Sequence, residues 1–194
     1  QGYSNEGTRL ASEVIWSGEI GNVTEVHAWT NRPIWPQGKS AIPPAEPVPS
    51  TLDWDLWLGV AQARPFTSGG AAEGKSGFYL PFNWRGFFDF GCGALGDMAC
   101  HILGAPNMAL RLGAPTSVEV IRQEGKNSLS FPSLSVIRFD FPARGAMPPL
   151  KLIWYDAMKD VPMRPAGLAE DELILGPGLD VGRGLAPLKP QPPA

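Results

Sequence analysis

Residues 89–101 read DFGCGALGDMACH and contain a literal G-x-G-x-x-G, formed by Gly91, Gly93 and Gly96. A triplet of this kind can hold the phosphates of a dinucleotide between a strand and a helix. It can also let a loop turn sharply into a helix, because glycine adopts backbone conformations that other residues avoid. In that case the triplet delivers Asp97 and His101 to a site. The two interpretations imply different folds and different functions.

Three features of the surrounding sequence argue against a dinucleotide loop. The preceding segment NWRGFFDF is interrupted by polar residues and a glycine, whereas a central parallel strand is almost wholly apolar. Asp97 follows the third glycine directly, where its carboxylate would repel a pyrophosphate. Glu119, about 20 residues on as the fingerprint requires, falls in the middle of a predicted strand. We therefore expect no cofactor-binding residues in this chain.

Asp97 and His101 are the strongest candidates for chemistry. They lie four residues apart, so on a helix they occupy one face, one turn from each other. We expect Asp97 in the first turn, where the helix dipole favours a carboxylate. An imidazole can exchange a proton near neutral pH, and a neighbouring carboxylate orients it. The alternative interpretation is a helix-capping Asp and a partly buried His without chemistry.

The hydrophobic pattern along the chain predicts an α/β fold with two long loops. Helical spacing of apolar residues predicts a helix over residues 5–17 and a longer one over residues 94–112. A short helix is expected within 50–59, capped near Ser50 or Thr51. Alternating or apolar runs predict four strands, at residues 22–31, 116–123, 134–141 and 150–156.

Three long motifs closely resemble the C-terminal domain of the Gfo/Idh/MocA oxidoreductase family. They are SNEGTRLASEVIWSGEIGNVTEVHAWTNRPIWPQG, LDWDLWLG and YLPFNWRGFFDFGCGALGDMACHILGAPNMALRLGAP. The resemblance implies an α/β (α+β) fold with an open, mostly antiparallel sheet packed against one long helix. This is a truncated form of the glyceraldehyde-3-phosphate-dehydrogenase-like C-terminal domain. We expect that domain over residues 1–161 and a Pro- and Gly-rich tail over 162–194.

The resemblance also implies roles for individual residues. GDMACH matches the catalytic pair of the family at Asp97 and His101, where the His exchanges the proton of the reacting hydroxyl while NAD(P) handles the hydride. Trp84, Arg85 and Asp89 fall where family members line the substrate pocket. For these three, core packing or a surface ion pair is an equally good interpretation. The implied ligand is a small sugar or polyol.

Departures from the family leave three functions open. The nucleotide-binding Rossmann half and its catalytic Lys have no counterpart, and Gly104 stands where many relatives have Asp. The first interpretation is a substrate-binding and oligomerisation domain that cannot bind nucleotide alone and forms a homo-oligomer, a dimer through its sheet. The second is a stand-alone hydrolase of an ester, phosphoester or glycoside, with Asp97 and His101 as base or as ligands of a divalent metal. The third is a non-catalytic carbohydrate-binding or assembly module.

The composition reduces the range of partners that we expect. The 194 residues carry a net charge of −3, which gives no reason to expect a nucleic acid or an anionic membrane as partner. No apolar run reaches the roughly 20 residues of a membrane span. The two cysteines do not form a disulfide framework. We expect a soluble protein of bacterial type, cytoplasmic or periplasmic, and the sequence does not assign the compartment.

Overall fold

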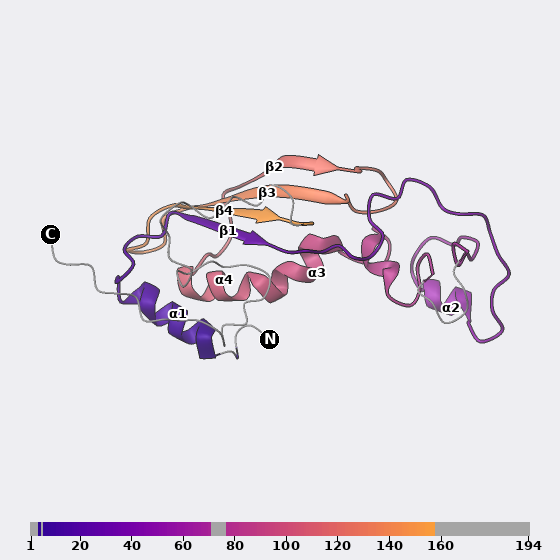
Figure 1. Cartoon of the computed structure of the whole chain (residues 1–194), viewed down its shortest axis with the longest axis horizontal. Coiled ribbons are helices and arrows are strands. Elements are labelled where there is room, and N and C mark those ends of the chain that lie inside the picture. The colour runs from indigo at the N-terminus through magenta and orange to yellow at the C-terminus, as the bar shows by residue number, and fades with distance from the viewer. Residues whose placement is uncertain (1–3, 5, 71–76, 158–194) are drawn as a thin grey trace.

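The computed structural model describes residue 4 and residues 6–70 and 77–157. The helical elements are α1 (Glu6–Trp16), α2 (Trp54–Leu58), the 3-10 helix η2 (Asn83–Gly86), α3 (Gly93–Ile102) and α4 (Gly104–Leu110). The strands are β1 (Glu25–Trp29), β2 (Ser117–Glu124), β3 (Leu134–Phe141) and β4 (Leu150–Tyr155). Figure 1 shows a body with strands in one layer and α1, α3 and α4 in the other. A long excursion around α2 projects from one end of this body.

The sheet has the order β1-β4-β3-β2. Strand β1 pairs with β4 in parallel, and the other two pairings are antiparallel. The predicted α/β fold with an open, mostly antiparallel sheet is therefore confirmed. Both β1 and β2 lie at an edge of the four described strands.

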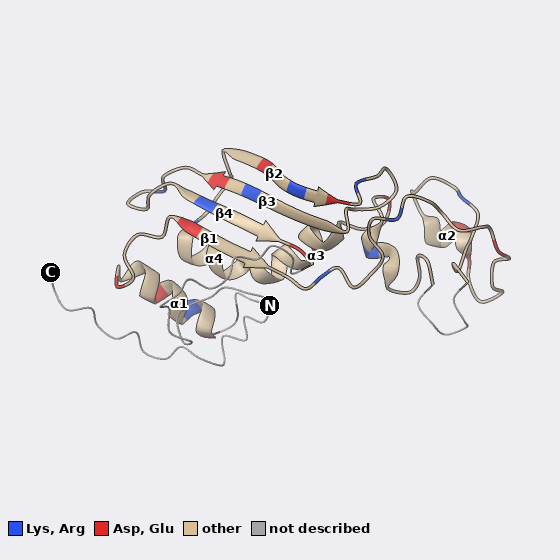
Figure 2. Cartoon of the chain, turned by 45° about the horizontal axis from the view of Figure 1, so that its top comes forward, with Lys and Arg blue, Asp and Glu red and all other residues tan. Residues whose placement is uncertain are grey.

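The two faces of the sheet differ because successive side chains of a strand point in opposite directions. On the face covered by α3 and α4, one row across the strands runs Ala28, Trp154, Ile137 and Val120. Ala28 and Trp154 are fully buried, and Ile102 of α3 packs against them. On the other face, Glu25, Lys151 and Asp140 lie side by side on neighbouring strands. Figure 2 marks the charged positions along the strands in red and blue.

The predicted helix over residues 94–112 is divided into α3 and α4 at Leu103. Pro106 explains the break, because it has no N–H to donate to Ile102 and its ring crowds that carbonyl. The two helices still run on beneath the sheet in nearly the same direction (Figure 1). Helix α1 packs against α4, where the indole N–H of Trp16 donates to the carbonyl of Ala109 at 2.7 Å.

Residues 40–70 and 77–82, here called the arm, form most of a second core, which also includes Phe87 after η2. Trp54 stacks on Trp57 with ring centroids 4.8 Å apart and planes 7° from parallel. Phe66, Tyr79 and Phe87 complete this aromatic cluster. The expected cap at Ser50 or Thr51 is wrong. Helix α2 begins at Trp54, three residues after Thr51, and Asp53 caps it by accepting the N–H of Leu56 at 3.0 Å.

The remaining expectations concern the ends of the chain and membranes. The tail predicted over 162–194, and the domain boundary at 161, lie outside the described residues. Within the described part of the chain, no helix has the length and apolarity needed to cross a bilayer.

Candidate functional site

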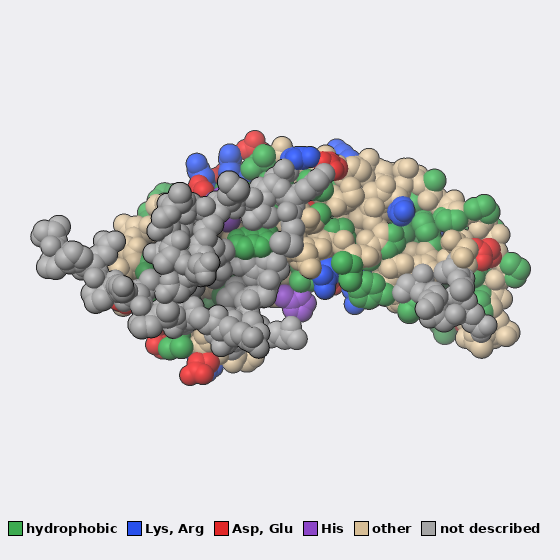
Figure 3. All heavy atoms as spheres, viewed as in Figure 1, with side chains coloured by type: hydrophobic (Ala, Val, Ile, Leu, Met, Phe, Trp, Pro, Cys, Tyr) green, Lys and Arg blue, Asp and Glu red, His purple; other side chains and the backbone are tan. Residues whose placement is uncertain are grey.

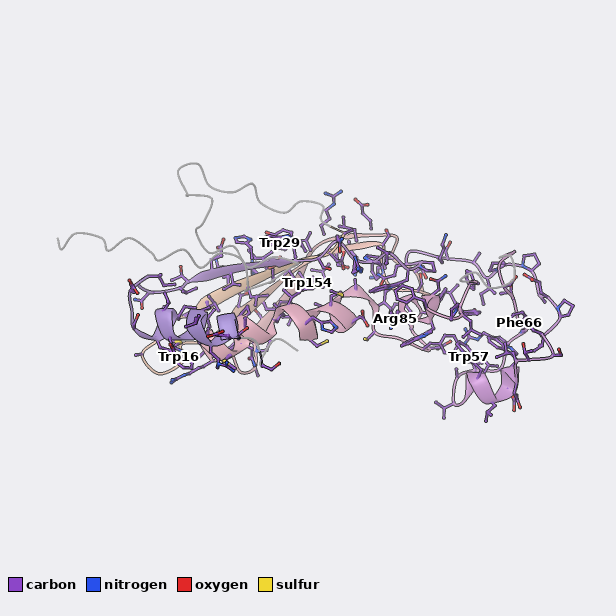
Figure 4. All side chains as sticks on the ribbon, turned by 60° about the horizontal axis from the view of Figure 1, so that its bottom comes forward. Trp16, Trp29, Trp57, Phe66, Arg85 and Trp154 are labelled. Carbon is purple, nitrogen blue, oxygen red and sulfur yellow. The ribbon has the colours of Figure 1, made fainter. Side chains whose placement is uncertain are left out.

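The candidate site lies at the junction between the sheet body and the arm. Arg85 stands on η2, and Asp97 and His101 stand on α3, which packs against η2. Figure 4 shows Arg85 between the sheet, marked by Trp154, and the arm, marked by Trp57 and Phe66. The resemblance therefore nominated residues from two elements that the fold brings together.

The guanidinium of Arg85 is fixed from several directions. Its central carbon lies 4.5 Å from the ring centre of Phe82 and 4.6 Å from that of Trp84. Nη1 donates to the carbonyl of Phe82 at 3.1 Å, and Nε lies 3.5 Å from Oδ1 of Asp97. The Arg85 and Asp97 side chains are 27% and 29% exposed. The pair is thus held in place while part of each side chain faces solvent.

His101 is exposed in the last turn of α3. No hydrogen bond joins it to Asp97, although the two residues share a helix face. Figure 3 shows a histidine at the surface beside basic side chains, near the middle of the molecule. The prediction that Asp97 lies in the first turn is wrong, because α3 begins at Gly93 and Asp97 is its fifth residue.

The three glycines of the triplet allow neighbouring parts of the chain to pack closely against them. A Cβ on Gly91 would meet the carbonyl oxygen of Arg85 at 2.5 Å, and one on Gly96 would meet Cβ of Cys92 at 2.5 Å. Gly93 has a φ of +64° and lies against Phe131. The chain before the triplet consists of η2 and turns, with an isolated bridge at Phe87, and not of a strand. The strand–turn–helix context of a dinucleotide loop is therefore missing at this position.

The proline-rich loop before the arm also supports the site, a contribution that the sequence did not suggest. Oε1 of Gln37 accepts the indole N–H of Trp35 at 2.8 Å and the N–H of Ala94, in the first turn of α3, at 2.9 Å. A Cβ on Gly86 of η2 would meet the carbonyl oxygen of Pro36 at 2.0 Å. The only signal in the sequence was the PQG motif within the family-like stretch.

A hollow of about 670 Å³ adjoins this loop. Phe82, which packs on Arg85, lies in its wall together with Lys39, Asn83 and Ser133. Its lining mixes amide, hydroxyl, amine and apolar groups, which suits a hydroxyl-rich ligand. The hollow and the Arg85 site therefore share one aromatic wall.

The structure places the other nominated residues as follows. Trp84 lies against the Arg85 guanidinium. Asp89 forms an ion pair with Arg64, whose side chain is only 11% exposed. Apart from the nominated residues, Trp35 and Trp54 are buried, and Trp57 packs in the arm.

Asp156, directly after β4, is the most strongly perturbed acid among the described residues. Its side chain is 2% exposed and accepts the backbone N–H of Ser135. Burial raises the pKa of Asp156 to about 6, although the Ser135 hydrogen bond acts in the opposite direction. This carboxyl belongs to the sheet and does not contact Arg85, Asp97 or His101.

A metal site requires more ligands than the candidate site provides. Within residues 6–70 and 77–157, no three His, Cys, Asp or Glu side chains are grouped so as to hold a metal ion. Asp97 and His101 would supply two ligands, whereas stable zinc sites use three or four protein ligands.

Comparison with known proteins identifies a family. The family model described as "Oxidoreductase family, C-terminal alpha/beta domain", of the Gfo/Idh/MocA group, matches residues 14–127, more than half of the chain. The matched range includes η2, α3, Arg85, Asp97 and His101. No curated protein matches the chain.

Proposed function

Because the chain belongs to the Gfo/Idh/MocA oxidoreductase family through its C-terminal α/β domain, we propose that it forms the substrate side of a sugar or polyol oxidoreductase. The observation that carries this proposal is the junction of η2 and α3. There a fixed guanidinium lies beside a carboxylate, and an exposed imidazole stands four residues further along the same helix.

Each residue has a distinct task in this proposal. Arg85 donates hydrogen bonds to substrate hydroxyls, since Phe82, Trp84 and Asp97 already orient its guanidinium. Asp97 keeps Arg85 in position and accepts a hydrogen bond from a hydroxyl. His101 takes the proton of the reacting hydroxyl and later returns it.

In this proposal the glycine triplet does not hold the nucleotide of the family. The glycine triplet follows η2 and turns, and it packs against the chain's own backbone and side chains. Family enzymes use NAD(P) as hydride carrier, and in this proposal another part of the enzyme binds it. No step assigned to Arg85, Asp97 or His101 passes through the nucleotide.

The first test is calorimetric titration of the full chain with a panel of sugars and polyols. We expect binding by at least one of them, and Arg85→Gln should weaken it about 10-fold, because a hydrogen bond from a charged donor is lost. Arg9→Gln, which removes the same charge from the exposed face of α1, should leave the affinity unchanged. Equal loss in both variants would contradict the role of Arg85.

His101 is tested by comparing its variant with that of Arg85. His101→Asn should bind the same polyol with nearly wild-type affinity, because the imidazole is assigned to proton transfer and not to binding. A loss of affinity as large as that in Arg85→Gln would contradict this assignment.

The charged part of the second sheet face supports a second proposal, a dimer formed by two copies of this surface. Across the strands, Glu25 lies beside Lys151 and Lys151 beside Asp140, while Arg138 forms an ion pair with Glu119 at 2.7 Å. Alternating charges of this kind can be matched by the same surface turned about a two-fold axis. Arg138→Glu should make the chain monomeric in analytical ultracentrifugation, whereas Arg9→Glu should not. A dimer that persists in Arg138→Glu would refute this interface.

A further inference from the structure

A second, more enclosed hollow lies at the end of the body opposite the arm. It has a volume of about 480 Å³ and is formed by the carboxyl end of α1, the carboxyl end of α4 and the connection between β3 and β4. In Figure 1 these three segments meet at the left of the molecule, and Figure 4 shows Trp16 there, far from Arg85. This hollow is therefore separate from the candidate site described above.

The described lining of this hollow has one sign of charge. Among the residues that the structure describes, Arg111 and Arg144 are the only ionisable ones that line it, and no described Asp or Glu does. The remaining wall is mostly apolar and includes Ile15, Trp16, Val23, Leu110 and Met147. Two guanidinium groups beside a half-exposed indole form a cationic site with an apolar wall, in a protein whose net charge is negative.

The two arginines are held in different ways. The guanidinium carbon of Arg111 lies 5.3 Å from the ring centre of Trp16, and its backbone has a φ of +51° directly after α4. Arg144 donates from Nε to the carbonyl of Leu110 at 2.9 Å and from Nη1 to that of Pro142 at 2.6 Å. The backbone of its own connection and the end of α4 thus orient Arg144.

The third nitrogen of Arg144 is unsatisfied. Nη2 is hidden from solvent and has no hydrogen-bond partner in the described part of the chain. A buried donor of a charged group without an acceptor is costly, and water cannot replace the acceptor where it has no access. Burial also lowers the pKa of Arg144 below its ordinary value, so the charge is poorly stabilised by its surroundings.

We propose that this hollow binds a small organic oxyanion, a carboxylate or phosphate monoester with an apolar body. The oxyanion bridges Arg111 and Arg144 and provides the acceptor that Nη2 lacks. The apolar body lies against Trp16 and the aliphatic wall. Contact with Nη2 requires a small outward shift of residues 145–148, where Gly145 has a φ of +60° and open space beside it.

Two helix ends oppose an anion at this place, and their effect is smaller than that of the arginines. The carboxyl ends of α1 and α4 each contribute a partial negative charge of about one half. Two guanidinium groups contribute a full positive charge each, and Arg144 already occupies the carbonyl of Leu110. The hollow therefore keeps an excess of positive charge.

The test is a titration of the full chain with phenyl phosphate, benzoate and inorganic phosphate, followed by calorimetry and by the NMR signals of the Trp indole N–H groups. We expect saturable binding of phenyl phosphate or benzoate at millimolar concentrations. The shift should be largest for the Trp16 indole N–H, assigned with Trp16→Phe. Inorganic phosphate should bind more weakly, because it cannot contact the apolar wall.

Two variants and one control make the test decisive. Arg111→Asn, which suits the left-handed backbone, should weaken binding about 10-fold, since one charged contact is lost. Arg144→Gln should abolish it, and Arg111→Asn covers the case in which Arg144→Gln fails to fold. Arg9→Gln, equal in charge change, should bind as the wild type does.

Three results would overturn the proposal. They are the absence of saturable binding to all three probes, equal affinity in the wild type and Arg111→Asn, and a Trp16 signal that does not respond. Inorganic phosphate binding as tightly as phenyl phosphate would refute the apolar part of the site. None of these results bears on sugar binding near Arg85. The proposal of an oxyanion site is therefore tested independently of the proposed function.

Discussion

The sheet body and the arm both bury tryptophans, but different features of the sequence place them. In the body, Trp154 is fully buried because it alternates along β4 with outward-facing residues and lies beneath α3. In the arm, Trp54 is 8% exposed and packs among Trp57, Phe66 and Tyr79, most of which lie in loops. A regular core arises from periodicity, whereas the arm's core depends on turns and on contacts distant in sequence.

The largest effect should come from truncating these two tryptophans. Replacing a buried Trp by Ala typically costs about 3 to 5 kcal/mol. Trp154→Ala should lower the free energy of global unfolding by that amount, because Trp154 joins the sheet to α3. Trp54→Ala should instead open the arm locally and leave most of the sheet protected. Hydrogen exchange distinguishes the two cases.

The expectation that the arm unfolds separately from the sheet body is wrong if Trp54→Ala exposes the amides of β3 and β4 as much as Trp154→Ala does. In that event the arm and the body unfold as one cooperative unit. Trp16→Phe, a substitution at a half-exposed position on α1, serves as the control, with an expected change within about 1 kcal/mol.

Substitution at the junction between body and arm should have the next largest effect on stability. In Gly86→Ala the new methyl group would overlap the carbonyl oxygen of Pro36, so η2 or the proline-rich loop has to move. We expect a loss of about 3 kcal/mol in unfolding free energy, the upper part of the range for overpacking. Gly18→Ala, at a φ of +76° with open space around it, should cost only about 1 kcal/mol. Similar losses in chemical denaturation would mean that the junction can relax.

A fall in pH should stabilise the sheet body and destabilise the arm. The pKa of Asp156 is raised by burial from 3.8 to about 6, so the folded state holds its proton more tightly than the unfolded state. The resulting stabilisation is complete below about pH 4 and is lost as the pH rises through 6. A shift of about two units corresponds to about 3 kcal/mol at most. Asp156→Asn should remove this part of the pH dependence of unfolding.

Glu46 in the arm provides the contrast. Its pKa is lowered, mainly by the hydroxyl of Ser68, which donates to the carboxylate at 2.6 Å. The stabilisation by Glu46 is therefore present above its ordinary pKa of 4.5 and is lost as the pH falls through the lowered value. Hydrogen exchange compared at pH 7 and at a pH below the lowered pKa of Glu46 should show the arm loosening in acid while the end of β4 tightens. The opposite pattern would refute both assignments.

The sequence predicted the body better than the arm for a physical reason. Residues 134–141 form β3 at the predicted limits, because apolar residues at alternate positions leave a strand one way to bury them. The break at Leu103 was missed, since the periodicity continues through it and only the backbone of Pro106 interrupts the helix. In the arm, Asp53 was overlooked as a cap because Ser50 and Thr51 are equally good capping residues.

In the candidate site, too, residues that belong to a sequence pattern were predicted, and residues that act through distant contacts were not. Asp97 and His101 were nominated through motif and spacing, and the structure adds an ion pair between Asp97 and Arg85. Phe82 and Gln37 were not found, because their roles depend on a loop far from α3 in the sequence. Such contacts have no period, and a single sequence gives no other signal for them.

The smallest effect should come from ion pairs at the surface of the two regions. Asp89→Asn breaks the pair with Arg64 beside the arm, and Glu119→Gln breaks the pair with Arg138 on the sheet. Asp89 is 45% exposed and Glu119 57%, so each loss should be at most about 1 kcal/mol in thermal unfolding. Asp89 is also a nominated substrate residue, and titration with the polyol that binds the wild type separates its two roles. If Asp89 serves only the ion pair, Asp89→Asn should shift the melting temperature slightly and leave the polyol affinity unchanged, as Glu119→Gln should. A reduced affinity in Asp89→Asn alone would show that this carboxylate contacts the substrate, and the candidate site would then extend from α3 toward the arm.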